Sequence, residues 1–162
     1  GGANLVTFAK HYAKCFTVDI SQPNLLECNR RLEAEGIEPA TPVHINPDRP
    51  ESVKDQINQP LDLFLCTAVY QHMPSRNYGL TINQLAFDLL APGGLALIQT
   101  RYDDGRKMFK PKNHSYKDNV TYFTSYSIEE FWQHLENTGF QCLAVKLRTT
   151  TNYAFYLAIK RK

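Results

Sequence analysis

The apolar residues of this chain recur at two spacings, one typical of helices and the other typical of strands. Leu5, Phe8, Ala9 and Tyr12 share one face at helical spacing, whereas residues 61–66 form an almost wholly apolar run of strand length, which suits a central strand covered on both faces. The same reasoning along the chain gives the remaining elements. The predicted helices cover residues 21–35, 51–58, 78–90 and 128–138, and the predicted strands cover 16–19, 42–46, 61–66, 95–100, 141–147 and 153–159.

Two of these helices carry recognisable end signals. Ser21 suits an N-cap, and Pro23 suits the first turn of the helix that follows. Ser127 and Glu130 have the spacing of a capping box, and Gly139 stands where that helix should stop. These local signals support helices at 21–35 and 128–138.

Strands that alternate with helices predict an α/β fold with a doubly wound, mostly parallel sheet. The last two strands are joined only by residues 149–152, TTTN, and so short a link makes an antiparallel hairpin. No repeat, low-complexity tract or internal linker divides the chain, so residues 1–162 are expected to form a single domain. Residues 103–120 carry little periodicity and several charges, which predicts a mobile loop.

Composition narrows the class of protein without identifying it. Hydrophobic residues make up 43% of the chain and charged residues 21%, an ordinary globular balance. A net charge of +2 gives little support for nucleic acid as a partner, and no apolar run is long enough to span a membrane. The cysteines form no CxxC pair and the histidines no metal-ligand spacing, which favours a cytoplasmic protein with reduced thiols and no metal site. The cysteines are Cys15, Cys28, Cys66 and Cys142, and the histidines outside the motif described below are His11, His44, His114 and His134.

The stretch from Gly1 to Ser21 has the pattern of the second half of a nucleotide-binding β-α-β unit. Glycines at a strand-to-helix turn let a ligand approach the backbone closely. Asp19, at the end of the next strand, can accept hydrogen bonds from both hydroxyls of a ribose. Gly2 and Asp19 lie 17 positions apart, close to the spacing of about 20 that such motifs have. The sequence therefore predicts that Gly2 and Asp19 contact a nucleotide-like cofactor.

In five segments the sequence resembles the class I, Rossmann-like S-adenosylmethionine-dependent methyltransferases. These are GGANL at 1–5, FTVDIS at 16–21, LDLFLCTAVYQHMP at 61–74, LLAPGGLALIQT at 89–100 and TNYAFYLAIKRK at 151–162. The resemblance spans nearly the whole chain and implies an enzyme that transfers a methyl group from S-adenosylmethionine. Methyl transfer from a sulfonium is an in-line displacement, so the protein contributes positioning, water exclusion and sometimes a base.

The resemblance also implies roles for individual residues. Asp48 corresponds to a residue that contacts the adenine amino group. His72 lies in VYQHMP, which resembles an "hHxP" signature, and a histidine there can act as a general base near neutral pH. Arg101 and Tyr102 directly follow the strand 95–100 and are candidates for facing the acceptor. The cofactor-binding residues implied in this way are Gly1, Gly2, Ala3, Asn4, Asp19, Ile20, Asp48, Thr67 and Ala68, and the catalytic ones are His72 and Tyr102.

The methyl acceptor is expected to be a small molecule. The family signature Asn/Asp-Pro-Pro-aromatic, used for amino groups of bases or glutamine, is absent, and this chain has CTAVY at that place. This favours the hydroxyl or amine of a sugar, a lipid or a natural product.

The glycine motif of the family begins earlier than this chain does. Gly2 matches the last glycine, so the resemblance implies that the first strand and the earlier glycines lie upstream of Gly1. That strand would sit between the strands 16–19 and 61–66. We therefore expect either a gap beside 16–19 or direct pairing of 16–19 with 61–66.

Two alternatives remain at this stage. A nicotinamide-dependent oxidoreductase shares the glycine turn and the ribose acid, and its short-chain type needs Tyr-x-x-x-Lys on a helix. Tyr156 and Lys160 have that spacing but lie on the last predicted strand, about 13 Å apart. The other alternative is a non-catalytic domain that has kept the fold.

Overall fold

The computed structural model describes residues 2–105 and 123–161, except the side chain of Ala3. The chain divides into two compact units, Gly1–Asn58 and Gln59–Lys162. Each unit is described by itself below. The predicted loop at 103–120 falls outside the described residues except for its first three positions.

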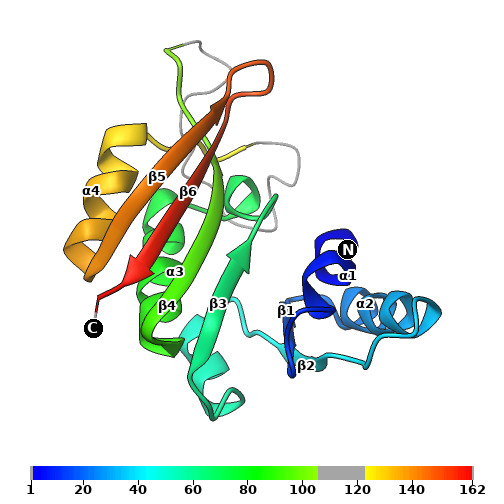
Figure 1. Cartoon of the computed structure of the whole chain (residues 1–162). Coiled ribbons are helices and arrows are strands. Elements are labelled where there is room, and N and C mark those ends of the chain that lie inside the picture. Colours follow the sequence, from blue (N-terminus) through cyan, green and yellow to red (C-terminus); the bar gives the residue numbers. More distant parts are fainter. Residues whose placement is uncertain (1, 106–122, 162) are drawn as a thin grey trace. The chain divides into compact units, whose positions relative to one another are not determined.

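Unit 1 consists of one β-α-β motif with a short helix on either side (Figure 1). The two strands, β1 and β2, are parallel, and Asp19 at the end of β1 pairs with His44 at the end of β2. The elements are α1 (Ala3–Ala9), β1 (Phe16–Asp19), α2 (Gln22–Ala34), β2 (Thr41–His44) and the 3-10 helix η1 (Pro50–Asp55).

Local chemistry explains where α2 lies. The Ser21 hydroxyl accepts a hydrogen bond from the backbone N–H of Asn24 at 3.4 Å, as an N-cap does, and Pro23 occupies the first turn. Leu32 on α2 is fully buried in a small core with Ala9 and Ala40. The predicted N-cap and helix are therefore confirmed, and α2 packs by its apolar face.

Unit 2 is built on a four-stranded sheet in the order β3-β4-β6-β5 (Figure 1). Strands β3 and β4 are parallel, whereas β6 runs antiparallel to both β4 and β5. The predicted α/β fold with a C-terminal antiparallel hairpin strand is confirmed. The elements are β3 (Leu61–Cys66), the 3-10 helix η2 (Tyr70–His72), α3 (Arg76–Leu89), β4 (Leu90–Arg101), α4 (Ile128–Thr138), β5 (Phe140–Arg148) and β6 (Tyr153–Lys160).

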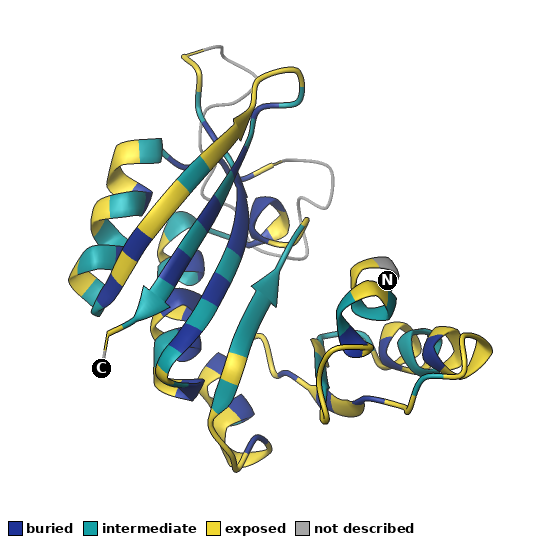
Figure 2. Ribbon diagram, viewed as in Figure 1, coloured by how far each residue is buried: buried dark blue, intermediate teal, exposed yellow. Residues whose placement is uncertain are grey.

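Alternate residues of β6 face opposite sides of this sheet. Ala154, Tyr156 and Ala158 are buried, and the Tyr156 ring lies 4.8 Å from the ring of Phe131 on α4. Figure 2 shows the alternation of buried and half-buried positions along β6. Helix α4 therefore covers one face of the sheet.

Four aromatic side chains form the centre of unit 2, and we call them the aromatic cluster. Tyr70 of η2 packs edge-on against Tyr126 and Phe131, with ring centroids 6.0 Å and 5.6 Å away. Phe131 also contacts Tyr126 at 5.1 Å and Tyr156 on β6. Such edge-to-face pairs add about 0.5–1.5 kcal/mol each beyond the burial of their area. The cluster joins a helix, a strand and the segment after β3 into one core.

Several predicted boundaries differ from the structure. The predicted helix at 51–58 is instead the 3-10 helix η1, and the strand predicted at 42–46 covers Thr41–His44. Residues 91–94, predicted to separate α3 from the next strand, belong to β4, which begins at Leu90. The β3–β4 register shifts between Leu61 and Leu63, and Gly93 has a φ of +85°, which only glycine adopts readily.

The strand predicted to be central is an edge of the unit 2 sheet. Among the described residues, β3 pairs with β4 and β1 pairs with β2, so residues 16–19 and 61–66 are not paired with each other. No residue of β3 is fully buried.

Within the described ranges, no helix is both long and apolar enough to cross a membrane.

Replacement of Gly139 tests how tightly the end of α4 is packed. Gly139 caps α4 with a φ of +111°, and an added Cβ would lie 2.7 Å from the Phe87 ring. That ring is held by Phe140, 5.2 Å away, and by the Lys160 ammonium group at 4.5 Å. Gly139→Ala should therefore lower the free energy of unfolding by about 2–4 kcal/mol, from backbone strain and overpacking together.

Gly93→Ala is the matched control, because Gly93 also has a positive φ but an added Cβ would meet nothing within 4 Å. It should cost only the strain, about 1–2 kcal/mol. Urea unfolding followed by the fluorescence of Trp132, the single tryptophan, measures both. Equal losses in the two variants would show that the Phe87 ring can move away.

Candidate functional site

The predicted cofactor residues of unit 1 begin at the turn before α1. Gly2 has a φ of +88°, and an added Cβ would lie 3.2 Å from Arg31 Cδ and 3.5 Å from Cys28 Cα on α2. The glycine thus permits a close approach between the start of α1 and α2. Asn4 is exposed, and Gly1 and the Ala3 side chain lie outside the described part of the chain.

Asp19 ends β1 with its carboxylate held in a fixed orientation. Its Oδ1 accepts a hydrogen bond from the backbone N–H of Ser21 at 2.8 Å, and its Oδ2 accepts one from Asn24 Nδ2 at 3.2 Å. Each carboxylate oxygen has two lone pairs, so both can accept a further bond. The next residue, Ile20, is half-buried, and its carbonyl lies 3.0 Å from His44 Nε2.

Asp48 follows β2 by four residues. Because β1 and β2 are parallel and Asp19 pairs with His44, the carboxyl ends of both strands meet at one edge of this small sheet. The Asp48 backbone N–H donates to Asn46 Oδ1 at 2.9 Å, which shapes the turn. Its side chain is exposed and makes no hydrogen bond or ion pair with residues that the structure describes. Asp19 and Asp48 therefore both follow strands that end at this edge.

In unit 2 the predicted cofactor residues Thr67 and Ala68 follow β3 directly. Ala68 has a φ of +59°, in the left-handed region that residues other than glycine seldom occupy. Such backbone costs on the order of 1–3 kcal/mol and is found preferentially at binding and catalytic sites. The strained residue therefore stands at the carboxyl end of a parallel strand, where ligands bind in open α/β sheets.

The aromatic cluster holds the 3-10 helix η2 that comes next. Tyr70 is fully buried, and its hydroxyl donates a hydrogen bond to Asn83 Oδ1 on α3. Burial raises the pKa of Tyr70 and of Tyr126, so neither phenol is a base near neutral pH. The cluster fixes the backbone that carries His72, two residues after Tyr70.

His72 lies at the rim of this core. Its ring is 5.5 Å from the ring of Phe123, and Gln71 Nε2 lies 3.2 Å from His72 Nε2. Partial burial lowers the pKa of His72, so the ring is neutral at neutral pH. A neutral imidazole at a strand end can accept a proton or a hydrogen bond from an acceptor molecule.

Arg101 and Tyr102, predicted to face the acceptor, are the last residue of β4 and the residue that follows this strand. The Arg101 guanidinium carbon lies 4.6 Å from the Phe123 ring centre. Phe123 therefore stands between Arg101 and His72. Tyr102 is only 9% exposed, and its backbone bridges to Tyr126. The structure thus brings Arg101, but not Tyr102, to the side of His72.

Sequence reasoning did not single out Phe123, which completes this group. The segment that carries it is attached to the turn after β3: the Thr124 N–H donates to the Gln71 carbonyl at 2.8 Å, and the Thr124 hydroxyl donates to the Met73 carbonyl at 2.7 Å. These bonds connect residues about 50 positions apart, so no local sequence signal could have revealed them.

The similarity of this chain to known proteins lies in its structure rather than in its sequence. No family model and no curated protein sequence matches it. Its structure is similar to that of an S-adenosylmethionine-dependent methyltransferase from Clostridium acetobutylicum, with a TM-score of 0.75, 14% identity, and coverage of 100% of this chain and 81% of the other. The chain has the Rossmann-like fold of class I S-adenosylmethionine-dependent methyltransferases.

Two further solved structures show how far this methyltransferase fold extends. One is 1,6-didemethyltoxoflavin-N1-methyltransferase from Burkholderia thailandensis, solved with 1,6-didemethyltoxoflavin and S-adenosylhomocysteine, with a TM-score of 0.70, 18% identity, and coverage of 99% of this chain and 67% of the other. The other is the [4+2]-cyclase SpnF, with a TM-score of 0.72, 12% identity, and coverage of 99% and 71%. The same fold therefore serves more than one reaction.

The pair Tyr156 and Lys160 does not form the oxidoreductase motif in this methyltransferase fold. Both lie on strand β6 rather than on a helix. Tyr156 is fully buried, and the Lys160 ammonium group donates to the carbonyls of Phe87 at 2.6 Å and Leu90 at 2.8 Å. Neither side chain is placed for hydride-transfer chemistry.

The pH titration of His72 tests the geometry around it. Because burial disfavours the charged ring, its pKa should lie below the ordinary value of about 6.5. Phe123→Ala should expose the ring and raise the pKa toward that value. Two-dimensional NMR of histidine ring protons measures it.

His134 is the internal control, because it lies on α4 with its Nε2 3.4 Å from the Leu80 carbonyl. Burial lowers the pKa of His134 as well, and Phe123→Ala should leave it unchanged. A His72 pKa that does not move in the variant would mean that Phe123 does not shield the ring.

Proposed function

We propose that this protein is an S-adenosylmethionine-dependent methyltransferase acting on a small-molecule acceptor. The observation that carries the proposal is Asp19, held by Ser21 and Asn24 at the end of β1 in a chain with the methyltransferase fold. The structural neighbour from Burkholderia thailandensis, solved with S-adenosylhomocysteine, supports the choice of cofactor, and its bound 1,6-didemethyltoxoflavin supports a small acceptor.

The residues present fit this cofactor by their chemistry. Each carboxylate oxygen of Asp19 keeps a lone pair, so Asp19 would accept hydrogen bonds from the ribose hydroxyls. Asp48 would accept a hydrogen bond from the adenine amino group, since its carboxylate has no partner among the described residues. The backbone of Thr67 and Ala68 would border the methionine part, where the positive φ of Ala68 turns the chain. When bound, the cofactor supplies an activated methyl group.

His72 would serve the acceptor rather than the cofactor. As a neutral ring it can take the proton that a hydroxyl or an amine must lose, or hold that group by a hydrogen bond. The aromatic cluster keeps η2 fixed, so the imidazole needs little reorganisation to act.

One finding supports a second candidate function, since a [4+2]-cyclase has the same fold. Fold alone does not separate the two, since function depends on the site. A domain that binds the cofactor but transfers no methyl group would satisfy the geometry around Asp19 equally well. Transfer of radioactivity from methyl-labelled donor to an acceptor library decides between them.

Calorimetric titration with S-adenosylhomocysteine measures how much Asp19 contributes to cofactor binding, and so tests the proposal. Asp19→Ala should weaken binding by about 2–3 kcal/mol, the scale of hydrogen bonds to a charged group. His72→Ala is the matched control and should leave this affinity nearly unchanged. The proposal fails if the Asp19 variant binds as tightly as the wild type, or if neither protein binds S-adenosylhomocysteine but both bind NAD.

We also propose that a strand upstream of Gly1 completes the cofactor site. Within unit 1, β1 pairs with β2 alone, and within unit 2, β3 pairs with β4 alone, so β1 and β3 each have one edge open in the described residues. Val18 on β1 is 46% exposed, although valine is usually buried in strands. A strand added at the open edge of β1 would pair with it and supply the earlier part of the glycine turn.

Adding the native upstream residues should therefore raise both the melting temperature and the affinity for S-adenosylmethionine. An extension of equal length and scrambled sequence is the control. If residues 1–162 alone bind the donor as tightly as the extended protein, the added strand is not needed for the site.

A further inference from the structure

Three side chains form a row across the end of the unit 2 sheet, and we call them the arginine row. Arg101 on β4 and Arg148 on β5 both pair with Tyr153 on β6, the strand between them. Residues directly opposite each other on neighbouring strands point to the same face. With strands about 4.8 Å apart, the two arginine Cα atoms are about 10 Å apart. Both guanidinium groups can thus reach one ligand.

Aromatic rings hold one of the two arginines in place. The Arg101 guanidinium carbon lies 4.6 Å from the centre of the Phe123 ring and 5.8 Å from that of Tyr153. Contacts of this kind engage the faces of a guanidinium, whereas its N–H donors lie in the plane. The Phe123 and Tyr153 rings therefore both lie beside the Arg101 guanidinium.

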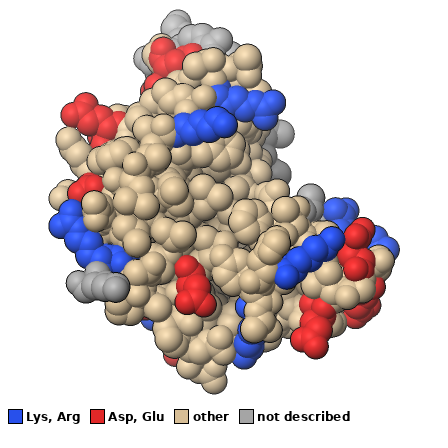
Figure 3. Space-filling view, in the orientation of Figure 1, with Lys and Arg blue, Asp and Glu red and all other residues tan. Residues whose placement is uncertain are grey.

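The second arginine adds charge at the same place. Arg148 is exposed and forms no ion pair with the residues that the structure describes. Basic side chains lie over the end of unit 2 where the β5–β6 hairpin turns (Figure 3). The two arginines thus bring positive charge to the face of the sheet that Tyr153 shares with them.

The arginine row is continuous with the group around His72. Phe123 contacts the Arg101 guanidinium on one side and the His72 ring, 5.5 Å away, on the other. An anion held by the row would place the rest of its molecule beside Phe123 and within reach of the imidazole. The ring of Phe123 would then lie against an aromatic or otherwise planar part of that molecule.

We propose that Arg101 and Arg148, with Tyr153 between them, bind an anionic group of the methyl acceptor, a carboxylate or a phosphate on an aromatic ring. The proposal rests on the proposed function for its reaction, but it assigns the acceptor class from these residues alone. Bidentate pairing with carboxylate or phosphate is the contact that arginine makes best.

The binding experiment uses three matched probes on the full chain: phenyl phosphate, benzoate and the uncharged benzyl alcohol. Calorimetry at pH 8 should show that at least one anionic probe binds about tenfold or more tighter than benzyl alcohol. Arg101→Gln and Arg148→Gln should each remove about tenfold of that affinity. Comparison of phenyl phosphate with benzoate tells which anion the row prefers.

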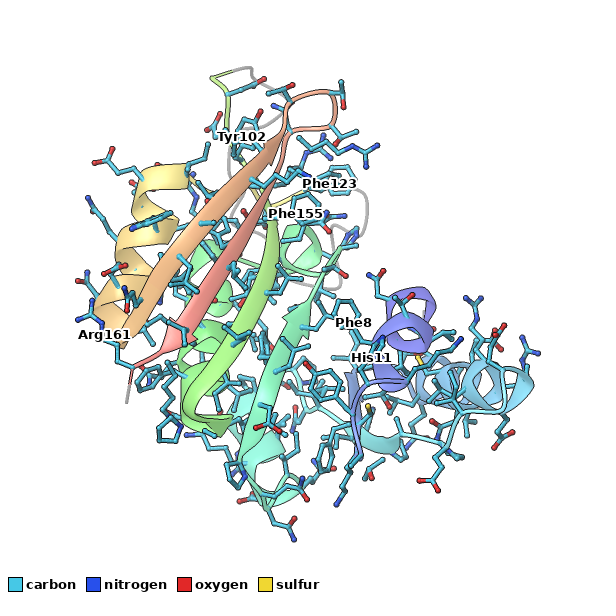
Figure 4. All side chains as sticks on the ribbon, in the orientation of Figure 1. Phe8, His11, Tyr102, Phe123, Phe155 and Arg161 are labelled. Carbon is cyan, nitrogen blue, oxygen red and sulfur yellow. The ribbon has the colours of Figure 1, made fainter. Side chains whose placement is uncertain are left out.

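Arg161→Gln is the control, because Arg161 lies at the opposite end of the sheet, where its guanidinium is 3.8 Å from Glu136 (Figure 4). It should leave all three affinities unchanged. The proposal is overturned if benzyl alcohol binds as well as the anions, or if Arg161→Gln weakens binding as much as the other variants. Tighter binding of a single-stranded oligonucleotide at the same residues would overturn the small-molecule assignment.

Titration with S-adenosylhomocysteine in the same samples keeps the two proposals apart. Arg101→Gln and Arg148→Gln should leave its affinity unchanged. If the chain with its native upstream residues binds phenyl phosphate through the arginine row but does not bind S-adenosylhomocysteine, the anion site stands and the methyltransferase proposal fails. If S-adenosylhomocysteine binds and none of the anions does, the reverse holds.

Discussion

The packing of the aromatic cluster is the constraint on which the rest of unit 2 depends. Tyr70, Tyr126, Phe131 and Tyr156 come from four different segments, and their rings meet within 6.0 Å of one another in consecutive pairs. Through Tyr70 the cluster fixes the turn after β3, and through Tyr126 it fixes the segment that carries Phe123. The candidate acceptor residues are thus attached to the most buried part of the unit. An irregular stretch of backbone can hold a defined geometry only with support of this kind.

Much of this architecture could be predicted because its signals are local. The N-cap at Ser21 and the glycine after α4 mark helix ends within one turn, and the apolar run 61–66 coincides with β3. The antiparallel hairpin follows from a connection only four residues long, in which Asn152 adopts a φ of +54° that asparagine tolerates. In each case a few neighbouring residues decide the local conformation.

The parts that sequence reasoning missed depend on contacts between distant segments. His72, Phe123 and Arg101 come from three parts of the chain, and only the folded structure shows that Phe123 lies between the other two. Tyr102 was predicted to face the acceptor because it follows a strand, and the fold buries it and bridges its backbone to Tyr126, 24 positions later. The positive φ of Ala68 likewise has no sequence signal, since alanine rarely adopts it. Such features are set by tertiary packing rather than by propensity.

The order of strands in unit 2 has a consequence for how the chain folds as it is synthesised. The last strand, β6, lies between β4 and β5, so β5 has no partner in the sheet until β6 has emerged. Lys160, at the end of β6, also bonds the carbonyls of Phe87 and Leu90 at the end of α3, some 70 residues earlier. Nascent chains that stop short of residue 153 would therefore expose the free edge of β4 and the apolar side of α4. Such intermediates are candidates for chaperone binding, and the unit can close only once its final strand is inserted.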